Sequence, residues 1–177
     1  MARILSNIKD VSGVGYNMEE EITLKPIGII HTPYKELKGI PIQGKFEKDI
    51  IGKVELFPEY EQGLKDIEGF SHIILIYYFD RSKDEKFIGR PFLEDEPHGI
   101  FAIRSPHRPN HIGFSIVKLE KVANNIITFS EIDILDGTPL LDIKPYVSHF
   151  DSRENVKNGW LDKHFKKGKI LKRTKLK

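Results

Sequence analysis

The sequence predicts an all-β protein, a closed antiparallel β-barrel with short helical segments and a basic C-terminal tail. Several short segments carry strand-like patterns, and they lack the repeated intervening helices that a doubly wound sheet requires. The 177 residues are 39% hydrophobic and 31% charged, which is typical of a globular domain with its own core. Strands of this number and spacing suit a closed barrel, because closure removes unpaired strand edges.

The expected strands differ in pattern along the chain. Residues 22–31 are rich in isoleucine, and residues 53–57 alternate apolar and polar side chains. Residues 71–79, SHIILIYYF, form a β-branched and aromatic run that is typical of a strand buried on both sides. Similar patterns predict further strands at 100–104, 114–122, 126–134 and 140–143. A hairpin is expected before residue 126, with Asn125 at positive φ.

Helical patterns are sparse and the remaining segments are polar. Short helices are expected at 59–68 and 155–167. The long charged connection at 83–98 is of a length that is usually functional or mobile. We therefore divide the chain into an N-terminal appendage at 1–21, with Met18 as an alternative start, a barrel domain at 22–152 and a basic tail at 153–177.

Composition excludes several kinds of chemistry. Cysteine is absent, so the chain has no disulfide, no thiolate zinc site and no cysteine nucleophile. No apolar run approaches the roughly 20 residues of a membrane-spanning helix. Residues 1–16 lack the apolar core of a secretory signal, so we expect a cytoplasmic protein without a membrane span.

Charge is distributed unevenly along the chain. Residues 157–177 contain nine Lys or Arg and one acid, whereas the preceding 156 residues contain 19 basic and 25 acidic side chains. A basic arm on a mildly acidic body suits a polyanion such as RNA, because neutralised phosphates release counterions. A solvated, frayed tail is the alternative.

The most informative motif is the segment 99–113, GIFAIRSPHRPNHIG. An apolar stretch leads to Arg104, and Pro106 and Pro109 stiffen the loop that follows. Arg104 and Arg108 could each bind a carboxylate or phosphate with two parallel hydrogen bonds. An arginine-rich surface loop with incidental ion pairs is the alternative explanation.

A metal site in this loop is disfavoured. His107 and His111 have the spacing of a helical zinc pair, and His98 is near in sequence. However, Pro109 stands between them and disrupts a helix that would place both on one face. We therefore predict no metal ligands.

Three further segments carry polar groups at turns or strand ends. Asp136 begins an Asp-Gly turn within residues 133–146, DILDGTPLLDIKPY, and such an aspartate can face a ligand or only form the turn. Gln43 lies in a loop bounded by Pro41 and Gly44, and its amide can recognise a nucleobase edge. Arg81 and Ser82 follow the buried strand at 71–79, where a barrel holds side chains rigidly.

Together these segments resemble the TsaA/TrmO-like family, also called YaeB-like. The resemblance rests on IGIIHTPY, PIQG, FSHIILIYYF, GIFAIRSPHRPNHIG and DILDGTPLLDIKPY and covers residues 25–152. It implies a homodimeric β-barrel that binds S-adenosylmethionine and methylates the exocyclic nitrogen of a threonylcarbamoylated adenosine beside the tRNA anticodon. The residues that the resemblance places around the cofactor are Gln43, Gly44, Arg81, Ser82, Arg104, Phe114 and Asp133. Those that it expects to complete or brace the pocket are Arg108, Asn110 and Asp136.

The expected mechanism depends mainly on positioning and on exclusion of water. Arg104 is expected to hold the cofactor's carboxylate, and Asp133 or a nearby carbonyl to accept hydrogen bonds from its amines. Asp136 and His107 are the two candidates for accepting the proton of the methylated amine, and the sequence does not choose between them. Two alternatives stay open, an RNA-binding barrel without enzymatic activity and a methyltransferase of the same fold with another substrate.

Overall fold

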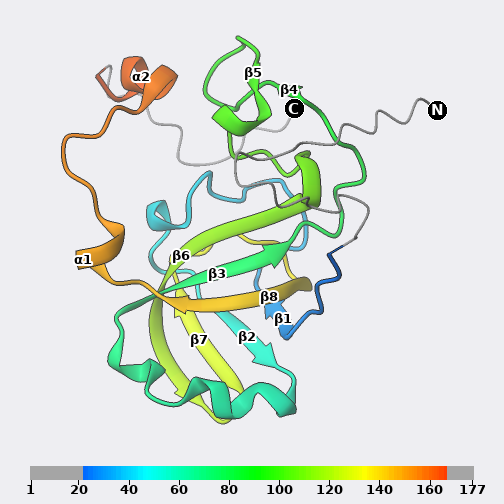
Figure 1. Ribbon diagram of the computed structural model, residues 1–177, viewed down its shortest axis with the longest axis vertical. Helices are drawn as coiled ribbons and strands as arrows, with labels where there is room; N and C mark the ends of the chain where they lie inside the picture. Colours follow the sequence, from blue (N-terminus) through cyan, green and yellow to red (C-terminus); the bar gives the residue numbers. More distant parts are fainter. Residues whose placement is uncertain (1–21, 167–177) are drawn as a thin grey trace, which may run out of the picture.

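The computed structural model describes residues 22–166, so the expected appendage at 1–21 and the last part of the expected tail, 167–177, lie outside the described residues. Within the described chain, six antiparallel strands close into a barrel in the order β1–β2–β7–β6–β3–β8 (Figure 1). Their bounds are Gly28–His31 for β1, Gly52–Leu56 for β2, His72–Tyr78 for β3, Ile112–Ala123 for β6, Ile126–Ser130 for β7 and Thr138–Pro145 for β8. The predicted all-β barrel is confirmed.

The longest ladder joins β3 and β6 and sets the register of the site. Tyr77 lies opposite Gly113, and Leu75 lies opposite Ser115. The strands β6 and β7 meet in the predicted hairpin, but Asn124, at φ 52°, takes the positive φ that was expected of Asn125. The side chain of Asn125 instead donates a hydrogen bond to the carbonyl of Leu56, 2.7 Å away.

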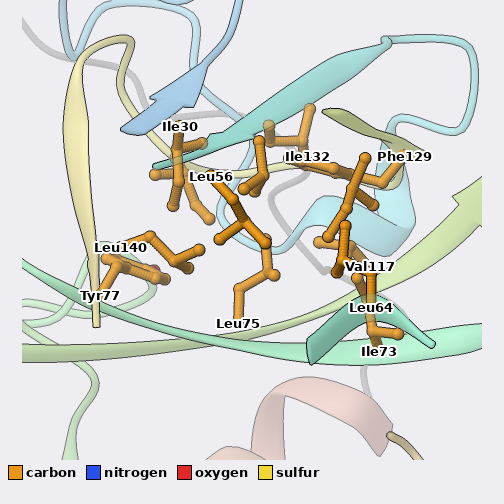
Figure 2. Close-up of a cluster of buried hydrophobic side chains, with 13 residues drawn as sticks. Ile30, Leu56, Leu64, Ile73, Leu75, Tyr77, Val117, Phe129, Ile132 and Leu140 are labelled. Carbon is orange, nitrogen blue, oxygen red and sulfur yellow. The ribbon is translucent and has the colours of Figure 1, made fainter. Parts of the chain in front are cut away.

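The core fills the inside of the barrel. Side chains alternate along each strand, so that Ile73, Leu75 and Tyr77 of β3 point inward together. Figure 2 shows Leu64, which comes from a 3₁₀ helix outside the barrel strands, beside Ile73 and Val117. The other strands contribute the buried side chains Ile30, Val54, Leu56, Val117, Ile127, Phe129 and Leu140.

The expected strand at 100–104 is wrong. Residues Ile100–Ala102 form the 3₁₀ helix η4, in which Ile100 is buried while Phe101 is exposed. Burial of Ile100 and Ile103 has a spacing of three, which suits a helical turn rather than a strand. The carbonyls of Ile100 and Ile103 also accept hydrogen bonds from Arg108, which takes the place of a strand ladder.

Other expected strands also differ in extent from those in the structure. Only Gly28–His31 of the expected 22–31 pairs in the sheet, as β1. Strand β7 ends at Ser130 rather than 134, because Glu131 takes a φ of 61°, which breaks the extended ladder. Strand β8 extends from Thr138 to Pro145, beyond the expected 140–143.

The helices are shorter and tighter than predicted. Residues 59–68 divide into the 3₁₀ helices η2 (Pro58–Leu64) and η3 (Ile67–Gly69), because Asp66 between them has a φ of 67°. The expected helix at 155–167 consists of η6 (Gly159–Leu161) and α2 (Asp162–Lys166). An unpredicted short helix, α1 (Ser148–Asp151), follows β8.

A separate small group of elements lies above one end of the barrel in Figure 1. It contains the two-stranded sheet β4 (Ile88–Gly89) and β5 (His98–Gly99), with α2 beside it. The 3₁₀ helix η5 (Pro109–His111) returns the chain from this group to β6. None of the helices described in residues 22–166 has the length and apolar character needed to cross a membrane.

Candidate functional site

Arg104 joins three segments that are far apart in the sequence. Its Nη1 donates a hydrogen bond to Oε1 of Gln43, 2.9 Å away, and its guanidinium carbon lies 5.9 Å from the centre of the Phe114 ring. Gln43 precedes the 3₁₀ helix η1 (Gly44–Phe46), and its Nε2 donates to the carbonyl of Ile42. A guanidinium over an aromatic face is a favourable cation–π pair. The arginine therefore lies on a polar and aromatic surface with further N–H groups available to a ligand.

Asp133 lies within electrostatic reach of this arginine and ends a buried hydrogen-bond chain. Its Oδ1 accepts a hydrogen bond from the hydroxyl of Ser115 at 2.6 Å, and the hydroxyls of Ser115 and Tyr77 lie 3.0 Å apart. Burial raises the pKa of Asp133, opposed by the hydrogen bonds from Ser115 and the Gly44 backbone and by the charge of Arg104. Burial likewise raises the pKa of Tyr77, so this phenol stays protonated. The carboxyl group is thus held in place by its hydrogen bonds, while burial disfavours its charged form.

Two glycines make this arrangement possible. A Cβ on Gly44 would lie 1.7 Å from the carbonyl oxygen of Glu131, so only glycine allows the loop to pack against the backbone before Asp133. A Cβ on Gly113 would lie 2.1 Å from the ring of Tyr77. Glycine at position 113 therefore leaves room for the tyrosine that bonds to Ser115.

A second set of expected site residues surrounds the turn at Asp136. Arg81 donates from Nη2 to the carbonyl oxygen of Asp136 at 2.5 Å. The Asp136 carboxylate accepts from Nζ of Lys35 at 2.5 Å and from the backbone N–H of Thr32 at 2.9 Å. The Lys35 and Thr32 hydrogen bonds hold the pKa of Asp136 below its usual range. A carboxylate engaged in this way is a weak base.

His107 and Ser82 form a separate contact at the end of β3. Nδ1 of His107 lies 3.2 Å from the hydroxyl of Ser82, and the backbone carbonyl of His107 accepts a hydrogen bond from Lys86. His107 is partly buried, and the Ser82 hydroxyl is the group that contacts its ring.

Arg108 and Asn110 shape the loop rather than the pocket surface. Arg108 donates from Nη2 to the carbonyls of Ile100 and Ile103, at 3.1 and 2.9 Å, and so braces the turn that leads to Arg104. Asn110 has a φ of 63° and His111 a φ of 47°, which makes the sharp bend before β6. The bend directs Nδ1 of His111 toward the carbonyl of Pro106.

The structure thus groups Gln43, Gly44, Arg104, Phe114 and Asp133. Arg81 and Asp136 form a neighbouring set, and Ser82 pairs with His107. Sequence reasoning missed Ser115 and Tyr77, although alternation along 113–117 places Ser115 on the inward face, where a polar residue is informative. Within residues 22–166, no three His, Asp or Glu side chains are grouped so that they could hold a metal ion.

Comparisons with known proteins agree with this architecture. Residues 29–152 match the family model of the tRNA-methyltransferase O N-terminal domain. A Pyrococcus abyssi protein named for S-adenosyl-L-methionine binding is 58% identical over 146 residues, which cover 82% of this chain and 79% of that protein. The mouse tRNA (adenine(37)-N6)-methyltransferase is 34% identical over 139 residues, covering 75% of this chain and 32% of the mouse protein.

A solved structure shows the same fold. The crystal structure of TrmO from Pseudomonas aeruginosa superposes with a TM-score of 0.71 at 34% sequence identity, covering 83% of this chain. The chain spans 64% of the length of that TrmO chain. The family model covers most of the barrel and includes both the Arg104 loop and the Asp133 segment. The chain therefore belongs to the tRNA-methyltransferase O family, the TrmO branch of S-adenosylmethionine-dependent tRNA methyltransferases.

Proposed function

We propose that this chain methylates the exocyclic amine of a threonylcarbamoylated adenosine beside the tRNA anticodon, with S-adenosylmethionine as methyl donor. The observation that carries the proposal is that Arg104 contacts Gln43 and Phe114 and lies within electrostatic reach of the buried Asp133 carboxylate. Family membership and the name of the mouse relative support the same activity. Its tRNA substrate makes the cytoplasm the expected place of action.

The residues present fit the cofactor chemically. S-adenosylmethionine carries a carboxylate, an ammonium, a sulfonium and an adenosine group, and when bound it supplies an electrophilic methyl group. Arg104 would bind the carboxylate through its remaining N–H groups. Asp133 keeps a second carboxylate oxygen that can accept from the ammonium or from a ribose hydroxyl. The Phe114 ring would pack against adenine or face the positive sulfur.

Binding geometry supplies most of the proposed acceleration. Asp133 is held by Ser115 and by the Gly44 backbone, and Gly44 is itself held against Glu131. A fixed carboxylate and a nearby guanidinium restrict how the cofactor can lie, which orients its methyl group toward the substrate amine. Displacement of water from this surface strengthens the same contacts.

We propose His107 rather than Asp136 as the acceptor of the proton that the amine loses. Lys35 and Thr32 already bind the Asp136 carboxylate and lower its pKa, so it is the weaker base. His107 has one ring nitrogen at the Ser82 hydroxyl, which leaves the other for a substrate proton. Arg81 and Asp136 then act as positioning residues at the neighbouring turn.

We also propose that the protein acts as a homodimer through the outer face of β3 and β6. The exposed side chains Tyr78, Ile112, Phe114 and Ile116 lie on this face, and β3 and β6 place Tyr78 opposite Ile112. Such an apolar sheet face suits association with a second copy. Because Phe114 also contacts Arg104, the partner would complete the pocket.

The decisive experiment is methyl transfer from labelled S-adenosylmethionine to tRNA with and without the threonylcarbamoyl group, followed by nucleoside mass analysis. We expect label only in the modified adenosine. Label in another nucleotide would assign a different substrate to the same fold. Binding of tRNA without measurable affinity for S-adenosylmethionine would favour the non-enzymatic RNA-binding barrel. Sedimentation of the wild type and of Ile116→Lys tests the dimer, which should dissociate in the variant.

A further inference from the structure

Side chains from two distant parts of the chain meet in a cluster that we call the clasp: Glu94, His98, Trp160, Lys163 and His164. The first two belong to the connection before Arg104, and the other three belong to η6 and α2. Nε1 of Trp160 donates a hydrogen bond to the carbonyl of Ala102 at 2.9 Å, and its ring stacks on His98 with 4.6 Å between centroids. The clasp therefore fastens the C-terminal segment to the turn that leads into Arg104.

Glu94 lies at the centre of the clasp, where 9% of its side chain is exposed. Its Oε1 lies 2.6 Å from Nε2 of His98, and its Oε2 lies 2.7 Å from Nε2 of His164 and 2.5 Å from Nζ of Lys163. The Lys163 hydrogen bond, followed by those from the two histidines, lowers the pKa of Glu94 to about 2 against the opposing effect of burial. The carboxylate is therefore ionised at neutral pH and can only accept, so both histidines present an Nε2–H to it.

The backbone before Arg104 is held by side chains instead of by a sheet. The carbonyl of Ala102 accepts a hydrogen bond from Trp160. The next carbonyl, that of Ile103, accepts from Nη2 of Arg108 at 2.9 Å, and the Ile103 side chain is itself buried. Two successive peptide groups before Arg104 are thus fixed, one by the C-terminal segment and the other by the loop that follows the arginine.

A fixed backbone matters for Arg104 because its side chain is exposed. The far end of this side chain contacts Gln43 and Phe114, and the near end depends on where the turn places its Cα. A long exposed side chain loses rotamer freedom when a ligand binds, and this loss opposes binding. A backbone that cannot shift keeps the guanidinium close to its binding position and so reduces that cost.

We propose that Trp160 is a positioning residue for Arg104 and thereby for the carboxylate of the methyl donor. Its hydrogen bond to Ala102 sets where the arginine leaves the backbone, and Glu94 keeps the segment of the tryptophan in place through α2. The inference rests on the proposed function, because it takes Arg104 as the residue that binds the carboxylate. The residues matched by the family model end at 152, so this contact comes from a segment outside the match.

The first test compares two ligands in Trp160→Ala. S-adenosylhomocysteine carries the amino-acid carboxylate and methylthioadenosine lacks it, so the two affinities separate the Arg104 contact from the adenosine pocket. Calorimetry on the full chain should show S-adenosylhomocysteine binding about three- to ten-fold more weakly than in the wild type, with methylthioadenosine binding unchanged. Trp160→Phe keeps a ring to stack on His98 but lacks the indole N–H, so its loss should be smaller. Phe150→Ala removes an exposed ring from α1 and should bind both ligands as the wild type does.

A double-mutant cycle shows whether Trp160 acts through Arg104. Once Arg104→Ala has removed the guanidinium, adding Trp160→Ala should weaken S-adenosylhomocysteine binding no further, because the tryptophan has nothing left to position. Losses that multiply in the double variant would mean that Trp160 supports the fold at large, which overturns the inference.

Glu94→Gln tests the clasp without removing a ring, and it serves if Trp160→Ala fails to fold. Glutamine keeps the size of the side chain but removes the charge to which Lys163 and both histidines donate. S-adenosylhomocysteine binding should weaken by about two-fold or more, and methylthioadenosine binding should not change. Glu96→Gln makes the same change at an exposed position of the same connection and should leave both affinities as in the wild type.

The contrary results separate this inference from the proposed function. Wild-type affinity for S-adenosylhomocysteine in both Trp160→Ala and Glu94→Gln, in a protein that transfers methyl groups, overturns the positioning role and leaves the activity. Equal weakening of both ligands also overturns it, because the clasp would then support the whole pocket. Selective weakening of S-adenosylhomocysteine in a chain that transfers no methyl group to tRNA keeps the positioning role and refutes the proposed function.

Discussion

Replacement of Arg104 by alanine gives the most direct measure of the candidate cofactor site. The guanidinium is exposed and makes one hydrogen bond to Gln43, so its other donors are available to a ligand carboxylate. A hydrogen bond to a charged group contributes about 1.5–3 kcal/mol. Because this side chain is partly screened by water, we take the lower end, about 1.5 kcal/mol, which corresponds to roughly ten-fold weaker binding of S-adenosylmethionine.

Isothermal calorimetry with purified full chain measures this loss directly. Arg153→Ala removes an equal charge from a residue that contacts backbone carbonyls after α1, and it should leave the affinity unchanged. Arg104→Lys keeps the charge but loses the planar fork, so its affinity should lie between those of alanine and wild type. Wild-type affinity in Arg104→Ala, with an unchanged melting temperature, would refute the role of this arginine.

Three further substitutions test the parts around it. Gly44→Ala should lower the free energy of unfolding by about 1–3 kcal/mol in a denaturant titration, because the added Cβ would clash with the backbone of Glu131. Gly63→Ala is the control, because a Cβ at that position would meet open space. The raised pKa of Asp133 means that the folded state holds this proton more tightly, so stability should fall as pH rises from about 3.9. Asp133→Asn should lack that fall; an identical pH profile would contradict the burial argument. His107→Gln should slow methyl transfer about 100-fold or more without changing cofactor affinity, as read in single-turnover assays; an unaltered rate would exclude it as the base.

Periodicity predicted the barrel well where side chains alternate between inside and outside. The run at 71–79, which was expected to be buried on both sides, became β3; its inward residues build the core, whereas its outward residues are partly buried or exposed. The apolar stretch at 100–104 failed because apolarity alone does not separate a strand from a turn with two buried residues three apart. The side chain of Arg108 stabilises this turn, because it binds the carbonyls of Ile100 and Ile103, which a strand would have paired with a neighbouring strand.

The sequence pointed to Arg104, Gln43 and Asp133 of the candidate site but not to Ser115 and Tyr77. Arg104 and Gln43 could be predicted because polar side chains in loops bounded by proline or glycine are typical of binding sites. Ser115 did not, because its role depends on the register that places it near Tyr77 and Asp133. Register between distant strands is a tertiary property, and local pattern does not carry it.

The two halves of the site differ in how firmly the fold holds them. Asp133 is fixed by Ser115 and by the loop at Gly44, whereas Arg104 is exposed and held through Gln43 and Phe114. A ligand with both a carboxylate and an amine can engage the two halves together. S-adenosylhomocysteine retains both groups and should bind about as well as the cofactor. Methylthioadenosine lacks them and should bind at least about ten-fold more weakly, as measured by competition. Equal affinity for the two would mean that the adenosine pocket alone holds the cofactor and that Arg104 and Asp133 serve only the fold.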